Sequence, residues 1–229
     1  NQLSKIKPLA SLAPNKDKVT TIHYAASNGH SEALKSLIEA AVVNGADRHI
    51  HTADIYGKTP LFSCASKGEI ETLKILIQAG ANIDKPDQNG VTPTCAAAFN
   101  GHSDVVKSLI GAGANFHKNH KIDESGTTPL IGAAIEGHVD TMRVLLQAGA
   151  DINKPKAGGA TPVYFASLKG HVAAIKLLAE AGADIDKAII NVGKTPIHAA
   201  AFAGHIDAVK LLAQAGADIN KATDRGITP

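Results

Sequence analysis

The chain has no tryptophan, and its aromatic residues make up 3% of 229 residues. A core built on a few large aromatic rings is therefore excluded, so small side chains must provide the packing. No apolar run approaches the roughly 20 residues of a membrane-spanning helix, and no signal peptide is visible at the start. We therefore expect no membrane insertion.

The chain also has few cysteines and little net charge. Two cysteines, Cys64 and Cys95, are too few for a disulfide framework and fit a reducing interior. We expect a cytoplasmic protein, with the nucleus or a host cell's cytosol as further intracellular locations. The formal net charge of +2 is close to balance. It gives no broad electrostatic reason to expect nucleic acid as a partner.

What the chain does have is one dipeptide, Thr-Pro, at nearly regular intervals. It stands at 59–60, 92–93, 128–129, 161–162, 195–196 and 228–229, with spacings of 33, 36, 33, 34 and 33 residues. A weaker copy, Thr20-Thr21-Ile22-His23, lies 39 residues before the first. A period of this size predicts stacked repeats, in which each unit buries its apolar face against its neighbours.

Each unit carries the signals of two short helices. Threonine is a good N-cap, and proline suits the first helical position. An Ala-rich segment follows and ends at a glycine, because a Cβ is disfavoured in the left-handed conformation after a helix. A second segment has apolar residues at helical spacing, such as Val105, Val106 and Leu109, and ends in Ala-Gly-Ala. A polar turn then leads to the next Thr-Pro.

A turn followed by two helices, with a period near 33, resembles the ankyrin repeat. The stretch TPIHAAAFAGHIDAVKLLAQAGADIN holds nearly every fixed position of that family's pattern, and the resemblance covers roughly Lys18 to Pro229. It implies an all-α solenoid with hairpin-like turns along one edge. Residues 1–17 are expected to be an N-terminal capping segment. The array at 18–229 has repeats starting near 20, 59, 92, 128, 161 and 195, and a further one begins at 228.

Eleven histidines invite a test for metal binding or catalysis. The resemblance assigns structural hydrogen bonds to those after the helix-ending glycine, which are His30, His102, His138, His171 and His205, and a structural role to His23 and His198. The pair His117-x-x-His120 has ligand spacing, but no Cys or second His pair accompanies it. No nucleophile–base arrangement, phosphate-binding loop or carboxylate pair stands out. We therefore expect no enzyme, no cofactor and no metal site.

In ankyrin arrays the two residues before the helix-ending glycine lie on the concave side. Four consecutive repeats have a large apolar residue at the first of these positions: Phe99, Ile135, Leu168 and Phe202. The second position holds Asn100, Glu136 and Lys169, and Lys67 in an earlier repeat. Exposed apolar runs mark interaction surfaces, so these residues are candidates for partner binding. The alternative is that the four apolar side chains only shield the stack.

The turn tips are a second candidate surface. Large apolar residues are unusual at exposed loop tips, and this chain has Ile55, Tyr56 and Ile190 there. Aromatic and aliphatic side chains often anchor protein interfaces, so these residues are candidates for partner binding. Gln88 and Glu124 occupy tips in other repeats. One lysine follows the second helix in each of five repeats, so stacking would align these lysines in a row. The row is either a set of solvated charges or a surface that attracts an acidic partner. Its members are Lys85, Lys118, Lys154, Lys187 and Lys221.

A resemblance-based modification site also exists. Ankyrin repeats often carry the pattern Leu-x5-Asp-Ile/Val-Asn, which a eukaryotic asparaginyl hydroxylase modifies. The segments ending at Asn153 and Asn220 match it. The predicted function is protein–protein binding by a monomer through the concave helix face and the turn tips. The alternative is the targeting region of a larger enzyme or bacterial effector, whose catalytic domain lies outside these residues.

Overall fold

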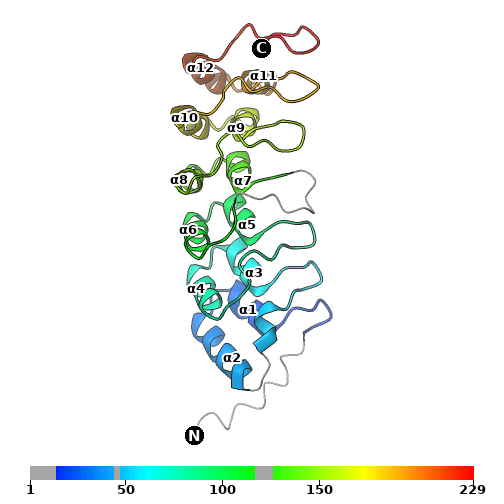
Figure 1. Ribbon diagram of the computed structural model, residues 1–229, viewed down its shortest axis with the longest axis vertical. Helices are drawn as coiled ribbons and strands as arrows, with labels where there is room; N and C mark the ends of the chain where they lie inside the picture. The colour runs from blue at the N-terminus through cyan, green and yellow to red at the C-terminus, as the bar shows by residue number, and fades with distance from the viewer. Residues whose placement is uncertain (1–13, 44–46, 117–125) are drawn as a thin grey trace.

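A computed structural model of the chain describes residues 14–43, 47–116 and 126–229. Within these residues the regular structure is helical, without a strand, and the helices stack in pairs into one elongated column (Figure 1). The predicted all-α solenoid is confirmed. An inner layer of helices lies beside the turns, which project along one edge, and an outer layer lies on the side away from the turns (Figure 1). Of the expected capping segment, 1–13 lie outside the described residues.

The inner helices are α1 (Thr21–Ser27), α3 (Pro60–Lys67), α5 (Pro93–Phe99), α7 (Pro129–Glu136), α9 (Pro162–Lys169) and α11 (Pro196–Phe202). The outer helices are α2 (Ser31–Val43), α4 (Ile70–Gln78), α6 (Ser103–Gly111), α8 (Val139–Gln147), α10 (Val172–Glu180) and α12 (Ile206–Gln214). A short 3-10 helix, η3 (Asp47–His51), follows α2. Each inner helix packs against the outer helix that follows it and against its counterparts in adjacent repeats.

Threonine hydroxyls cap the inner helices. The Oγ1 atoms of Thr59, Thr92, Thr128 and Thr161 accept the backbone N–H three residues on, at 3.1 to 3.3 Å. In α1 the ring of His23 completes a capping box, with Nδ1 2.8 Å from the Thr20 hydroxyl. These bonds satisfy N–H groups that a helix start leaves without an intrahelical partner.

The core runs the length of the column. Alanines on the inner helices, such as Ala97, Ala133 and Ala166, are fully buried, and their small side chains let neighbouring inner helices approach closely. The outer helices contribute larger buried side chains, including Leu76 and Leu145. Since one repeat has too little apolar area to close a core alone, each depends on the repeat stacked against it.

Histidine rings join successive repeats. Nε2 of His102, His138, His171 and His205 lies 2.9 to 3.2 Å from a carbonyl oxygen of the repeat before, on Ser66, Phe99, Ile135 and Leu168. A carbonyl oxygen can only accept, so Nε2 carries the proton in each case. The first junction differs, because Glu69 stands at the histidine position. There the Thr72 hydroxyl donates to the carbonyl of Ala26 at 3.0 Å.

The lysines after the second helix also cross between repeats. Nζ of Lys85, Lys187 and Lys221 donates to the carbonyl oxygens of His51, Asn153 and Asp186, at 3.2, 3.4 and 2.9 Å. Lys154 also has an interaction, and Lys118 lies outside the described residues. These lysines help to hold the stack, so neither reading of the row accounts for them fully.

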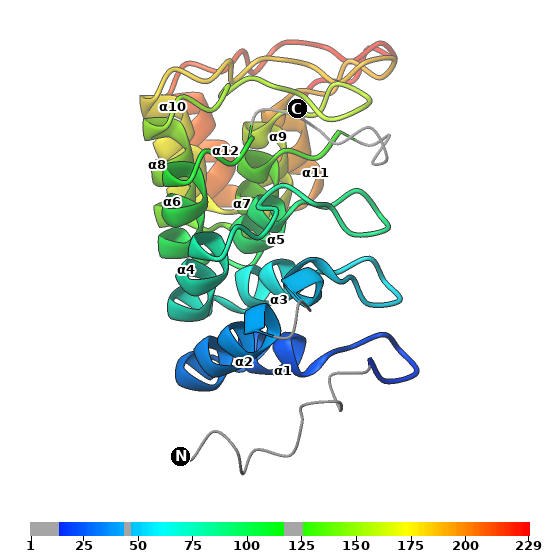
Figure 2. The same ribbon diagram turned by 60° about the horizontal axis from the view of Figure 1, so that its bottom comes forward.

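The turns project along one edge of the column (Figure 2), and backbone hydrogen bonds join several neighbouring pairs of them. The backbone N–H of Ile55 donates to the carbonyl of Asp17, that of Gln88 to Tyr56 and that of Ile190 to Gly158, at 2.8 to 3.0 Å. A Cβ on Gly57 would lie 2.6 Å from the backbone nitrogen of Gln88, so this close approach requires glycine. These bonds hold the turns of the paired repeats next to each other.

Candidate binding surface

The apolar stripe, Phe99, Ile135, Leu168 and Phe202, lies one residue per repeat on α5, α7, α9 and α11. Its ends are exposed, with 45% of Phe99 and 80% of Phe202 accessible to solvent. Ile135 and Leu168 are half-buried. The carbonyls of Phe99, Ile135 and Leu168 accept the interrepeat histidine bonds, so the junctions hold the backbone of the stripe in place. We call the side of the inner helices that carries this stripe the inner-helix face.

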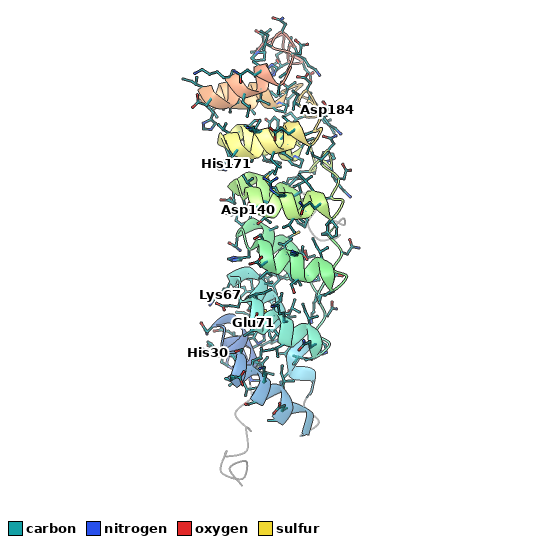
Figure 3. The ribbon with its side chains drawn as sticks, turned by 90° about the vertical axis from the view of Figure 1, so that its left-hand side faces the viewer. His30, Lys67, Glu71, Asp140, His171 and Asp184 are labelled. Atoms are coloured by element: carbon teal, nitrogen blue, oxygen red, sulfur yellow. The ribbon has the colours of Figure 1, made fainter. Side chains whose placement is uncertain are left out.

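The polar neighbours of the stripe are exposed. The side chain of Asn100 is held in place by two hydrogen bonds. Its amide Nδ2 donates to the carbonyl of Ala96 at 2.8 Å and to the Ser66 hydroxyl at 3.4 Å. Lys67, Glu136 and Lys169 lie at or near the ends of their inner helices with exposed side chains. Seen from the side of the outer helices, Lys67 lies along the same edge of the column as His30 and His171 (Figure 3).

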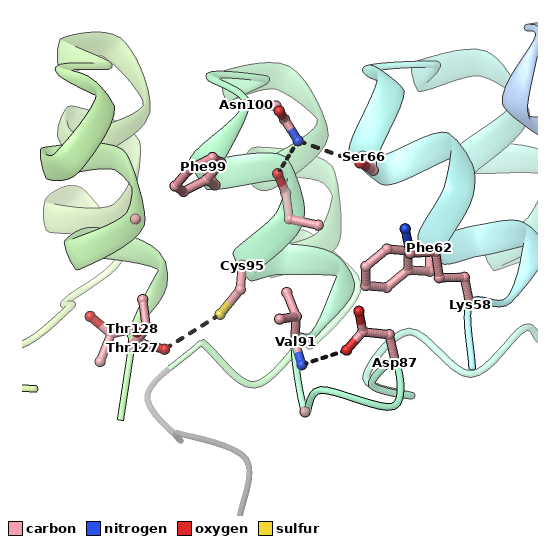
Figure 4. Close-up of a pocket in the computed structure, with 13 residues that line it drawn as sticks. Lys58, Phe62, Ser66, Asp87, Val91, Cys95, Phe99, Asn100, Thr127 and Thr128 are labelled. Carbon is pink, nitrogen blue, oxygen red and sulfur yellow. Dashed lines mark hydrogen bonds between the residues drawn. The ribbon is translucent and has the colours of Figure 1, made fainter. Parts of the chain in front are cut away.

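A cavity of about 300 Å³ opens on this face between α3, α5 and α7. Figure 4 shows Cys95 and Phe99 on the side of α5 that faces α7, with Thr127 and Thr128 across from them, and Phe62 on the side that faces α3. Val91, Gly132 and Lys58 also line the cavity. Its volume is at the lower end of the range for ligand pockets, roughly 300–1,000 Å³. It can therefore hold one large side chain or a small molecule.

Charge at the cavity comes from one lysine and one carboxylate. Nζ of Lys58 lies 5.6 Å from the ring centroid of Phe62 and 6.0 Å from that of Tyr56, within reach of a cation–π attraction. The carboxylate of Asp87 is buried, and its Oδ1 accepts the backbone N–H groups of Asn89 and Val91 at 2.9 and 3.0 Å. Asp87 is therefore engaged in shaping its own turn.

A family model for ankyrin repeats matches three successive stretches of the chain, residues 1–87, 79–156 and 154–223. The chain belongs to the ankyrin repeat family. Its fold is similar to that of the human ASB11 ankyrin repeat domain, at 27% sequence identity and a TM-score of 0.82, over 92% of this chain and 90% of that one.

A curated relative is human transient receptor potential cation channel subfamily A member 1, 38% identical over 61 residues. Those residues are 27% of this chain and 5% of the channel subunit. This ankyrin array therefore resembles a small part of that protein. Because one fold serves many functions, the match bears on the repeats and not on channel activity.

The turn tips of the ankyrin array carry the expected exposed apolar side chains. Ile55 and Tyr56 are exposed, and Ile190 has 62% of its surface accessible. Gln88 is exposed as well, while Glu124 lies outside the described residues. Val192, which sequence reasoning missed, is also exposed. It lies two residues beyond Ile190, so the tip between α10 and α11 is more apolar than expected.

The two asparagines of the modification pattern differ in environment. Asn153 is half-buried, and its Oδ1 accepts the backbone N–H of Asp184, in the next repeat, at 2.8 Å. Asn220 is exposed, and its backbone N–H donates to Oδ1 of Asp218. The side chain of Asn153 thus connects two repeats of the ankyrin array.

Possible metal ligands are dispersed over the described part of the ankyrin array. There, no group of three or more His, Cys, Asp and Glu residues is arranged to hold a metal ion. His117 and His120 lie outside the described residues. No described helix has the length and apolar character needed to cross a membrane.

The cavity residues Phe62, Cys95 and Gly132 were missed in the sequence, although one signal was available. Four residues after the capping threonine, Gly132 stands where other repeats carry larger residues, which are Tyr24, Ser63, Ala96, Phe165 and Ala199. A glycine inside a helix lowers helix stability, so its presence at this position is itself informative.

Proposed function

We propose that this ankyrin repeat domain binds a segment of a partner protein along the inner-helix face. Ankyrin repeat domains are in general protein-interaction modules. The observation that carries the proposal is the exposure of Phe99, which is 45% accessible to solvent although repeats stack on both sides of its helix. Large exposed aromatic side chains are frequent among the residues that contribute most to binding.

Two groups of residues would contact the partner. The inner-helix face contributes Lys67, Phe99, Asn100, Ile135, Glu136, Leu168, Lys169 and Phe202. The turn tips contribute secondary contacts through Ile55, Tyr56, Gln88 and Ile190. The proposed role is binding by a single copy of the chain, without catalysis, inside the cell. Neither Cys64 nor Cys95 is in a disulfide, which supports the location, since oxidising compartments favour disulfides.

Truncation of exposed apolar residues tests the proposal. Partners are first captured with the domain as bait and identified, and the dissociation constant of each purified complex is then measured. Phe202→Ala is expected to weaken binding by about 1–3 kcal/mol. The matched control is Ile206→Ala, because Ile206 is 67% exposed in the same repeat but belongs to the outer helix α12. Equal losses for both variants would count against the inner-helix face.

Leu168→Ala separates binding from shielding of the stack. Its side chain is half-buried, so truncation is expected to weaken both binding and folding. If the stripe only shields the stack, Leu168→Ala lowers stability by about 2 kcal/mol and leaves the affinity unchanged. Urea unfolding and binding assays on the same variant distinguish these outcomes.

A further inference from the structure

Gly132 of α7 lines the cavity between α3, α5 and α7 and faces Phe99 of α5. A Cβ added to Gly132 would meet the Cβ and Cα of Phe99 at 3.6 and 3.7 Å, which is ordinary contact distance. Any longer side chain at this position would extend further along the cavity wall. The corresponding position on α9 is occupied by the much larger Phe165.

Lys58 is the cation at this cavity. Its ammonium group contacts the rings of Phe62 and Tyr56. Among the described residues it has no carboxylate partner within 4.0 Å. A lysine held against aromatic rings and not paired with an acid can accept a carboxylate from outside.

The inner-helix face has an excess of such lysines. Lys67 and Lys169 are exposed at the ends of α3 and α9, and Nζ of Lys194 lies 4.8 Å from the ring centroid of Phe202. In the described part of the chain these three also lack an ion pair. The carboxylates near these four lysines include Glu136, Asp87 in the cavity, and Asp54, whose Oδ1 accepts the backbone N–H of Lys58 at 2.8 Å. Charge complementarity therefore favours an acidic partner.

We propose that the cavity takes one large apolar side chain of an extended, acidic segment of a partner protein, and that Lys58 pairs with a carboxylate next to that side chain. This rests on the proposed function and names the chemistry of the partner. The apolar side chain lies beside Phe99 and against Gly132, and Phe62 and Lys58 line the opposite end of the cavity. Gly132 sets the depth of the cavity and so the size of the side chain accepted.

Selection from a random-peptide library displayed on phage tests this, with the whole chain immobilised. Enriched peptides are expected to contain Phe, Leu, Ile or Met next to Asp or Glu. Synthetic copies are then titrated by fluorescence anisotropy against four variants: Gly132→Leu, Gly132→Ala, Lys58→Met and Phe202→Ala. Gly132→Leu fills the cavity and is expected to weaken binding at least about tenfold, and Lys58→Met weakens binding and reduces its salt dependence.

Gly132→Ala keeps the test valid if the leucine variant folds poorly. The added methyl makes only ordinary contacts, and alanine is a better helix former than glycine, so folding is retained while the cavity narrows. Protection of the Cys95 thiol from iodoacetamide by bound peptide is a second readout, because Cys95 lines the cavity.

The outcomes separate the two proposals. Peptides that lose affinity in Phe202→Ala but bind both Gly132 variants and Lys58→Met normally would overturn the cavity proposal and leave the inner-helix face intact as the binding surface. Peptides that bind every variant equally, or a selection that enriches none, would count against both. Enrichment of basic peptides would overturn the acidic partner.

Discussion

The imidazole Nε2 of His171 donates a hydrogen bond to the carbonyl oxygen of Ile135, 2.9 Å away and one repeat earlier. The same ring lies against Gly137, where a Cβ would be 2.7 Å from Cγ of the imidazole. Gly137 also has φ of 76°, in the left-handed region. This glycine is therefore required twice, once for its backbone conformation and once for the approach of the next repeat.

Gly137→Ala should destabilise the array more than Gly149→Ala. Both glycines have positive φ, 76° and 89°, but a Cβ on Gly149 would meet nothing within 4 Å. The Gly149 variant is expected to lose about 1 kcal/mol from backbone strain alone. The Gly137 variant adds a steric clash with the His171 ring. Urea unfolding of the two variants measures the difference.

A double-mutant cycle identifies the clash. In a His171→Ala background, Gly137→Ala is expected to cost about as much as Gly149→Ala, because the ring is gone. Gln88→Ala, at an exposed turn tip, is the control for a neutral surface change. If Gly137→Ala costs the same with and without His171, the contact with the ring carries no energy.

The first repeat is expected to lose stability as the pH falls below about 6.5. Burial lowers the pKa of His23 below its ordinary value of 6.5, although the hydrogen bond to the Lys58 carbonyl and the charge of Asp54 act to raise it. The unfolded chain therefore binds the proton at a higher pH than the folded one. Stability is present above the unfolded pKa and is lost as the pH falls through the folded pKa.

His23→Gln isolates this effect from the other histidines. Glutamine is a common partner in a capping box and does not titrate. Unfolding free energies at about pH 7.5 and about pH 5.5, within the range in which histidine titrates, are expected to differ less for the variant than for the native chain. An unchanged difference would assign the pH dependence to other groups.

The two thiols should react very differently in the folded protein. Cys64 is fully buried, and burial raises the pKa of its thiol to about 12. Because the thiolate is the reactive form, Cys64 is expected to resist a thiol reagent until the chain unfolds. Cys95 is partly exposed in the cavity and is expected to react in the folded state. Cys95→Ser should therefore abolish the prompt reaction with a chromogenic disulfide.

Metal ions are expected to have no effect on stability. EDTA should leave the thermal midpoint unchanged, and zinc should not raise it, because His117 and His120 supply two ligands where structural zinc sites use four. A zinc-dependent rise that disappears in the double variant His117→Ala, His120→Ala would overturn this expectation.

The fold was accessible from the sequence because its signals are local. A threonine followed by proline starts each inner helix after the first, and a glycine with positive φ ends it, as at Gly68 and Gly170. Each signal can be recognised without knowing which residues of the next repeat it packs against. Their repetition then implied the stack.

The candidate site was less accessible because it depends on residues from different repeats. The cavity needs Phe62, Cys95 and Gly132 together. These residues are 33 and 37 positions apart in the sequence, and they line one cavity only when the repeats stack. The burial of each residue in the apolar stripe likewise depends on the repeat stacked beside it. Leu168 is half-buried and Phe202 exposed at equivalent positions, because a following repeat stacks beside Leu168. Whether the stripe binds a partner stays a prediction.

In the described part of the chain, the helices of each repeat pack chiefly against those of its immediate neighbours, and this has a mechanical consequence. A pulling force applied at the two ends passes through every junction in series, with no parallel tie to share it. The column should therefore extend elastically, because each junction contributes a small displacement. Under a larger load, a repeat that opens would lengthen the chain by its own contour and leave the remaining ones folded.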